Sequence, residues 1–332
     1  MKKIKILFTV YLLILTATMF ANDSDSVDIY PKTKPIIKVF GNYHFGLNDY
    51  STVNAFELTR AYLGYDVKVS ENISFKTNID MGRPTSDSKY DYVAYLKTAA
   101  LKYHKGKIQI NAGLIGLKQF KLQEKIWGHR YVYKSLQDEH KFGHSADLGV
   151  MLEYKLIDGL FIDATIRNGE GYKKLQSDET FNGALGITYH VWKNIVVRGS
   201  YEHSEKSINQ SVYSGLIGFQ MKDVILMGVE YNYMQNSSYI KNHNLTGYSA
   251  YLTFIMNDKF QLFGRYDNLK SNKINDEIIS WNESNDGEAI IAGVQYKLEK
   301  NLKVSTNLQY WAPDKNSLNK EVYAFISLEY KL

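Results

Sequence analysis

The stretch EVYAFISLEYKL, residues 321–332, alternates between apolar and polar side chains. Ala324, Ile326 and Leu328 share one face, whereas Ser327 and Glu329 lie on the other. This period of two predicts a β-strand with one apolar and one polar face. In a soluble sandwich the apolar face packs into a core. In a membrane barrel it faces lipid, and the charged face lines water.

The same alternation recurs in 302–310, 63–69 and 73–80. Short turns and longer polar connectors separate the predicted strands in regular succession. The turns lie at 70–72, 105–106, 158–159, 193–194, 222–223, 257–258 and 299–301, and most contain Asn, Asp or Gly, which tolerate the positive φ of tight hairpins. The longer connectors lie at 47–54, 82–91, 117–144, 168–179, 204–210, 235–244, 268–286 and 312–319.

Seven turns and eight connectors predict sixteen strands with both termini on the side of the short turns. An even strand number, short periplasmic turns and long outer loops are typical of outer-membrane barrels. We therefore predict an all-β fold, a transmembrane antiparallel β-barrel of about 16 strands over 36–332. Fourteen or eighteen strands remain open. The expected location is the outer membrane of a Gram-negative bacterium, in contact with its lipid.

Residues 1–21 have the pattern of a secretory signal peptide. Lys2, Lys3 and Lys5 precede the apolar run 6–15, and Ala21 lies just before the expected cleavage point. The alternative is an N-terminal anchor helix, for which the apolar run is short. Residues 22–35 are then an N-terminal periplasmic segment.

The composition excludes several kinds of chemistry. Cysteine is absent, so no disulfide, thiol nucleophile or cysteine-ligated metal is expected. The chain has 40 Lys and Arg against 35 Asp and Glu, and three of the lysines belong to the predicted signal peptide. The small remaining excess gives no reason to expect a nucleic-acid partner.

The connector 117–144 is the longest, and it is rich in basic residues. A folded-in loop can narrow a barrel of this size, and its apolar residues, such as Ile126 and Trp127, need something to pack against. A basic constriction favours anions and repels cations. The alternative is an outer loop with solvated lysines. The candidate constriction residues are Lys118, Lys121, Lys125, Arg130 and Lys134.

Strand alternation also places charged residues on the water-facing side of the wall. Asp66, Asp80, Asp163, Glu202 and Asp267 share that side with the cations, so the wall is mixed and does not by itself indicate anion selectivity. A ladder of cations that leads to the loop is a plausible anion path. The candidate pore-lining residues are Arg60, Lys68, Lys76, Arg167, Arg198, Arg265 and Lys303.

Three segments resemble the outer-membrane phosphate-selective porin O and P family, especially its divergent members in Bacteroidetes-like bacteria. They are FELTRAYLGYDVK at 56–68, IQINAGLIGLKQF at 108–120 and HSADLGV at 144–150, so the resemblance covers about 50–170. It implies a sixteen-stranded barrel, usually a homotrimer, that conducts phosphate or polyphosphate. It also implies that Lys118 and Lys121 are the leading constriction residues.

The residues do not suggest an enzyme. His144 and Ser145 are adjacent on a predicted strand, so their side chains point to opposite faces and do not form a catalytic pair. His129, His140 and His144 lack a regular metal-ligand spacing, and no cofactor motif is present. We hypothesise a porin, a passive channel for small hydrophilic solutes with a preference for anions, phosphate among them. The alternative is a surface binding or adhesion protein with a plugged barrel.

Overall fold

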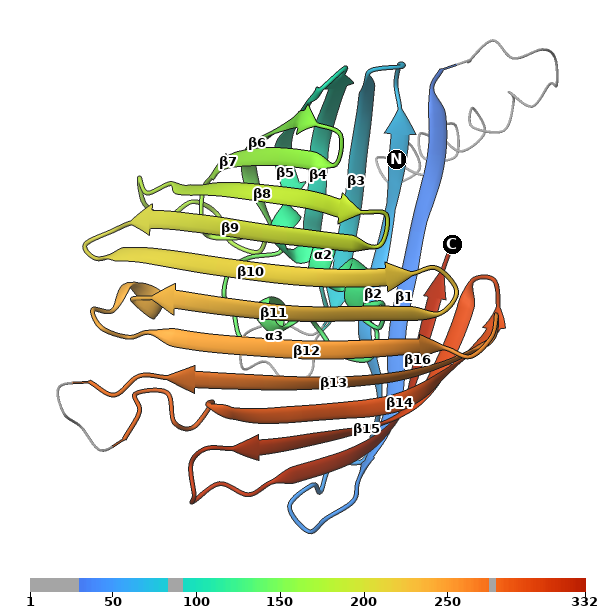
Figure 1. Ribbon diagram of the computed structural model, residues 1–332, viewed down its shortest axis with the longest axis vertical. Coiled ribbons are helices and arrows are strands. Elements are labelled where there is room, and N and C mark those ends of the chain that lie inside the picture. Colours follow the sequence, from blue (N-terminus) through green and yellow to red (C-terminus); the bar gives the residue numbers. More distant parts are fainter. Residues whose placement is uncertain (1–29, 83–91, 275–278) are drawn as a thin grey trace, which may run out of the picture.

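The computed structural model describes residues 30–82, 92–274 and 279–332. Sixteen strands follow one another around a closed antiparallel barrel, and β1 completes the ring by pairing with β16 (Figure 1). Each strand pairs with its neighbours in sequence, so the topology is an up-and-down meander. The predicted fold class and strand number are confirmed. The predicted signal peptide, 1–21, lies outside the described residues.

The strands have the following bounds: β1 (Lys32–Gly46), β2 (Ala55–Lys68), β3 (Ile73–Gly82), β4 (Val93–Lys105), β5 (Ile108–Gly116), β6 (Ala146–Ile157), β7 (Leu160–Arg167), β8 (Asn182–Trp192), β9 (Ile195–Glu205), β10 (Asn209–Met221), β11 (Ile225–Gln235), β12 (Leu245–Ile255), β13 (Phe260–Ser271), β14 (Gly287–Glu299), β15 (Leu302–Pro313) and β16 (Glu321–Lys331). Short turns and longer connectors alternate between them as predicted. We call the two ends of the barrel the short-turn rim and the long-connector rim.

Individual strand ends differ from the prediction by a few residues. β1 begins at Lys32, where 22–35 was expected to be a separate segment, because Lys32 pairs with Lys68 on β2. β9 and β10 approach so closely that only 206–208 separates them, and β13 continues to Ser271. Strand ends depend on cross-strand pairing, which side-chain alternation does not encode. Within the second and seventh connectors, 83–91 and 275–278 lie outside the described residues.

The two faces of the wall have opposite character. Outward side chains are apolar and exposed, as shown by Ile217 and Val229, each 59% exposed. Inward side chains are polar, and Asn232, Ser249 and Asp267 are almost completely buried. A soluble protein would place these two classes the other way round. The apolar exterior is the surface that a bilayer covers.

The connector 117–144 lies inside the barrel and contains the helices α2 (Lys118–Trp127) and α3 (Leu136–Glu139) (Figure 1). We call residues 117–144 the inserted segment. Helix α2 packs against β10, β11 and β12, and α3 packs against β12. A short 3₁₀ turn, η1 (Ser237–Tyr239), lies in the β11–β12 connector. No helix in the described part of the chain is long and apolar enough to cross a membrane.

Apolar packing holds the inserted segment against the wall. Trp127 is 1% exposed, and its ring lies 5.8 Å from that of Tyr251 and 5.9 Å from that of Phe263. Burial of a side chain of this size contributes about 1.5–3 kcal/mol. Gly218 on β10 leaves the space that the Ile126 side chain fills, since a Cβ there would lie 2.2 Å from Ile126 Cδ1.

Two further apolar clusters secure the ends of the inserted segment. Leu117 and Phe120 pack against the wall of β4, β5 and β6 near Ile115. Phe142 packs against β10–β13, where Val212 and Leu245 are among its neighbours. The segment therefore spreads over much of the inner wall.

Candidate functional site

The inserted segment divides the lumen into a covered wall and an exposed wall. The inward side chains of β12–β14 beneath it, such as Phe263 and Ile291, are buried. On β1, β3 and β4, by contrast, Lys34, Lys76 and Lys102 are exposed. Register places Lys76 opposite Ala100 and Lys102 opposite Ser74, on the inward face. Water in the lumen therefore meets lysines on one side and the inserted segment on the other.

Asp80 organises a group of charges on the exposed wall. Its carboxylate is inaccessible to solvent and accepts hydrogen bonds from Arg60 Nη1 at 3.1 Å and from Lys97 Nζ at 3.4 Å. Tyr172, in the β7–β8 connector, donates its hydroxyl at 2.6 Å. Two cations therefore share one carboxylate, which leaves a local excess of positive charge.

Arg130 organises a second group on the inserted segment. Its guanidinium donates to Glu124 at 2.9 Å and to Asp138 at 2.8 Å, so it joins α2 to α3. Burial acts to raise the pKa of Asp138, but nearby cations outweigh it and lower that pKa, chiefly Arg130, then Lys134, with smaller contributions from Lys97 and Arg60. The charges around Asp80 and those around Arg130 are therefore near enough to interact. Together they form the candidate constriction.

Aromatic side chains connect the inserted segment to β1 and β2. The ring of Phe40 lies 6.4 Å from that of Tyr131 and 6.1 Å from that of Tyr62. Tyr131 also donates its hydroxyl to Gln295 on β14 at 3.1 Å. The segment is consequently anchored on two sides of the barrel.

The sequence-predicted constriction residues have different surroundings. Lys118 forms ion pairs with Glu153 and, at 3.7 Å, with Asp163. Lys134 lies 3.2 Å from Glu139, and Arg130 is paired as described. Lys121 and Lys125 are exposed, and neither forms an ion pair within the described residues. Only part of the predicted basic set therefore presents uncompensated charge.

The sequence-predicted pore-lining residues also separate into two groups. Arg167, Arg198 and Arg265 are 2%, 5% and 4% exposed, so water hardly reaches them. Their carboxylate partners are Glu202 for Arg167, Asp163 at 2.7 Å for Arg198 and Asp267 at 2.6 Å for Arg265. Among the others, Arg60 binds Asp80, Lys303 lies 3.1 Å from Glu329, and Lys68 and Lys76 are exposed on the inner wall.

Sequence reasoning missed several cations of the exposed wall. Lys34, Lys38 and Lys102 have inward register, and continued alternation along their strands would have found them. Lys97 is different, because β4 has an irregularity in its pairing with β3 between residues 96 and 98. A bulge shifts the alternation by one residue, so the sequence pattern could not assign Lys97 to a face.

Lys76, Lys102 and Lys121 form a group that we call the lysine cluster. The surrounding protein displaces much of the water around Lys121 although its side chain keeps accessible surface, and this desolvation, followed by repulsion from Lys76 and Lys102, lowers the pKa of Lys121 to about 8. No carboxylate forms an ion pair with any of the three within the described residues. Asn111 is opposite Lys102 in register, and its Nδ2 is buried without a hydrogen-bond partner. Asp66 is opposite Lys76 in register and is also exposed, so an anion at the cluster finds several donors beside one neighbouring carboxylate.

The other candidate chemistries have no assembled site. His144 and Ser145 share no hydrogen bond in the described part of the chain. No group of three or more His, Cys, Asp or Glu side chains that could hold a metal ion occurs among the described residues. Burial lowers the pKa of His129 to about 3, so His129 is neutral where its Nε2 meets the Thr253 hydroxyl at 3.0 Å.

Comparison with known proteins gives matches in structure only. No protein-family model matches the chain, and no curated protein matches it in sequence. OmpF of Salmonella typhi, solved with daunomycin, aligns with a TM-score of 0.69 at 14% identity over 92% of this chain and 100% of that one. This chain has the fold of the outer-membrane porins.

Two other porin-fold structures support the same assignment. The outer membrane channel DcaP of Acinetobacter baumannii aligns with a TM-score of 0.65 at 12% identity, over 94% of this chain and 100% of that one. The anion-selective porin of Comamonas acidovorans aligns with a TM-score of 0.64 at 8% identity, over 91% and 100%. At such identities the likeness concerns the porin fold alone. The narrower resemblance to the phosphate-selective porin O and P family remains a hypothesis.

Proposed function

We propose that this protein is a passive diffusion channel in the outer membrane of a Gram-negative bacterium, and that it favours small hydrophilic anions. The apolar exterior of the closed barrel is suited to lipid, and the polar interior is suited to water. The channel performs no bond chemistry. The proposed path of the solutes is the part of the lumen that the inserted segment leaves open, beside Lys34, Lys76 and Lys102.

The lysine cluster is the observation that carries the anion preference. Within the described residues Lys76, Lys102 and Lys121 form no ion pair, with Asp66 opposite Lys76 as a neighbouring acid, whereas Arg130 and Lys134 are paired with carboxylates. Uncompensated cations between low-dielectric walls raise the local concentration of anions. The three ammonium groups repel one another, so an anion that binds between them is stabilised by relief of this repulsion. No single rigid site holds the anion, so it can also dissociate.

Phosphate is the first anion to test. The resemblance of residues 50–170 to phosphate-selective porins suggests it. The three ammonium groups could also donate to several oxygens of one ligand. A monovalent spherical anion such as chloride would use fewer of these donors. We therefore expect phosphate to compete with chloride for the lumen.

We also propose that the channel assembles as a homotrimer. OmpT of Vibrio cholerae, which matches this chain in fold with a TM-score of 0.60, was solved in a trimer form. The outward faces of the strands are apolar around the ring, so they can meet another barrel as readily as lipid. Light scattering of the purified protein in detergent would give the number of protomers.

Planar-bilayer recording tests the channel itself. Purified protein should open pores, and a salt gradient should give a reversal potential of the sign expected for anion preference. Replacing the cluster (Lys76→Gln, Lys102→Gln and Lys121→Gln together) should move that potential toward zero. The matched control is Lys222→Gln, Lys259→Gln and Lys300→Gln, which removes the same charge from exposed positions at the short-turn rim.

Two outcomes would contradict the proposal. Cation selectivity, or a cluster variant that behaves as the control does, would remove the lysine cluster as the source of preference. If correctly folded protein opened no pore, the hypothesis of a channel would be wrong. That second result would favour the alternative, a surface binding or adhesion protein with a plugged barrel.

A further inference from the structure

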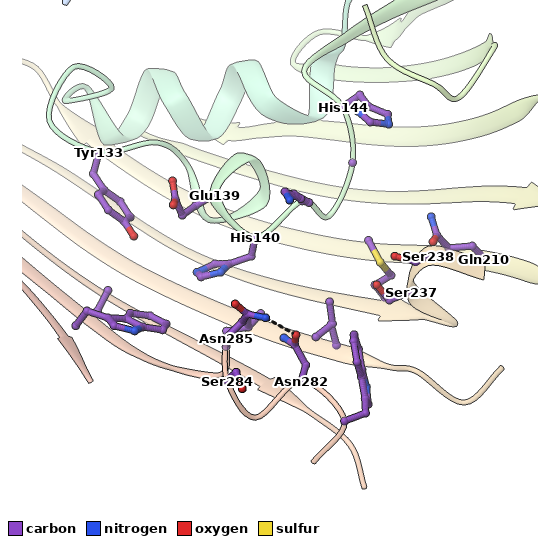
Figure 2. A pocket seen from close by; sticks show the side chains of 18 of the residues that line it. Tyr133, Glu139, His140, His144, Gln210, Ser237, Ser238, Asn282, Ser284 and Asn285 are labelled. Atoms are coloured by element: carbon purple, nitrogen blue, oxygen red, sulfur yellow. Dashed lines mark hydrogen bonds between the residues drawn. The ribbon is translucent and has the colours of Figure 1, made fainter. Parts of the chain in front are cut away.

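A cavity of about 890 Å³ lies on the long-connector side of the inserted segment (Figure 2). We call it the outer vestibule. Glu139 and His140 project into it from the inserted segment, and Ser237 and Ser238 come from the β11–β12 connector (Figure 2). The β13–β14 connector contributes Asn282, Ser284 and Asn285 (Figure 2). Its volume lies in the range of about 300–1,000 Å³ that is typical of small-molecule sites. The lysine cluster lies elsewhere and lines none of it.

One wall of the outer vestibule is aromatic. Trp311 on β15 and Tyr323 and Phe325 on β16 line it, and the His140 ring lies 6.2 Å from that of Trp311. His44 on β1 extends this surface, with its ring 5.7 Å from Tyr323 and 5.2 Å from Phe325. Flat rings in a water-filled mouth offer apolar faces to a solute that passes over them.

A second aromatic surface belongs to the β13–β14 connector. Trp281 lines the outer vestibule, and its ring stacks on that of His243 at 4.4 Å. The Trp281 Nε1 donates to the Asn244 carbonyl at 3.1 Å, which holds the indole in place. Two of the four tryptophans of the chain therefore line this one cavity.

Amide and hydroxyl groups surround these rings. Asn285 Nδ2 donates to Asn282 Oδ1 at 2.9 Å (Figure 2). Asn282 Nδ2 in turn donates to Asp286 Oδ1 at 3.1 Å, so both amides are held in defined orientations. Gln309 Nε2 is similarly held by Asn307 at 3.0 Å. The remaining lone pairs and protons of such groups can bond a ligand that both donates and accepts.

Several charged side chains of the outer vestibule are compensated within the protein. Glu170 is 3.3 Å from Lys206, and Glu139 is 3.2 Å from Lys134. Glu202 forms an ion pair with Arg167. Lys141, Lys174 and Glu321 also line the cavity and form no ion pair among the described residues, so its rings and neutral polar groups stand beside a few charges of both signs, whereas the lysine cluster is cationic.

We propose that the outer vestibule binds a saccharide, with a sugar ring against Trp311 and hydroxyl groups on the amides of Asn282, Asn285 and Gln309. A pyranose has a flat apolar C–H face and a rim of hydroxyls that donate and accept, which matches both halves of the lining. A purely apolar solute would leave the amides unpaired, which is unfavourable. A simple anion would gain nothing from the rings.

Saccharide binding in the outer vestibule is a separate property from the proposed channel. Only a role of this binding in transport rests on the proposed function. A weakly bound saccharide at the mouth would be concentrated ahead of the constriction. Binding itself is a property of the folded barrel and can be measured without any pore activity.

The experiment titrates the purified full-length protein with maltotriose, cellotriose and raffinose and follows tryptophan fluorescence. We expect a saturable change with at least one of them. Trp311→Ala should weaken binding about tenfold, in line with the worth of a good aromatic contact. Trp311→Tyr should retain most of it, because it keeps a ring. Trp192→Ala is the matched control, since Trp192 is 70% exposed at the far end of β8.

Single-channel recording provides an independent readout. The same saccharides should interrupt the current in the wild type and less often in Trp311→Ala, with the open conductance in KCl unchanged. A poly(ethylene glycol) of equal hydrodynamic size should interrupt it less than the best trisaccharide.

The proposal is overturned if none of the three saccharides gives a saturable change, or if Trp311→Ala binds as the wild type does. It is also overturned if the poly(ethylene glycol) blocks equally well, since size alone would then explain the effect. Absence of any KCl conductance would count against the proposed channel and would leave the fluorescence result standing. Heat-modified migration on a gel checks that each variant is a folded barrel.

Discussion

Arg265 on β13 donates a hydrogen bond from Nη1 to the backbone carbonyl of Lys134 in the inserted segment, at 2.7 Å. Its other guanidinium nitrogens bind Asp267, and its charge lies 5.2 Å from the centre of the Trp127 ring. A cation that strand alternation assigns to the pore surface thus holds the inserted segment on the wall. Inward register decides which side of the wall a residue occupies but not whether water reaches it.

Arg265→Gln should loosen the inserted segment. The substitution leaves Asp267 buried without its cation, and breaking a buried ion pair costs about 3–5 kcal/mol. We expect a lower thermal midpoint of the folded barrel and noisier single-channel currents, because the segment would move at its Lys134 attachment. Lys222→Gln provides the control, since Lys222 is exposed in the β10–β11 turn. Quiet currents of normal size in folded Arg265→Gln would contradict this role.

Two glycines on β10 give a matched test of the packing of α2. Gly218→Val should displace the helix, because even a Cβ at this position would lie 2.2 Å from Ile126 Cδ1. Gly215→Val should be tolerated, since no atom lies within 4 Å of a Cβ at that position. Overpacking of this kind costs about 1–3 kcal/mol.

The measurement for this pair is open-channel conductance. We expect Gly218→Val to conduct less than the wild type, because α2 would be pushed off β10 toward the opposite wall and would narrow the lumen, and Gly215→Val to conduct normally. Equal conductance in the two folded variants would mean that α2 does not limit the pore.

Anion preference should fall as the pH rises through about 8. The pKa of Lys121 is lowered to about 8, so the lysine loses its proton above that pH and the cluster loses one charge. Reversal potentials measured from about pH 6 to about pH 9.5 should show the decline, with the preference greatest at the acid end. Lys121→Arg should keep the preference and abolish its pH dependence, since arginine remains charged throughout. A wild-type reversal potential that is flat across this range would show that Lys121 does not set the selectivity.

Residues of the candidate site differ in how far the sequence could predict them. Lys76 faces the lumen as its alternation with Phe75 predicts, and Lys102 could have been found in the same way. Lys97 could not, because the irregularity in β4 breaks the alternation. Lys118 illustrates a further limit. Its pairing with Glu153 of β6 joins residues whose closeness follows only from the closed barrel and from the placement of the inserted segment.

The sequence by itself predicted about sixteen strands, with fourteen or eighteen left open, and it determined the side of the wall that each regular residue faces. These features are local, since they follow from alternation and from turn residues between neighbouring strands. Tertiary structure alone decided that Arg167, Arg198 and Arg265 are buried while Lys76, Lys102 and Lys121 remain uncompensated. The physical reason is that solvation and ion pairing depend on which distant strands the inserted segment covers, and no local pattern records that contact.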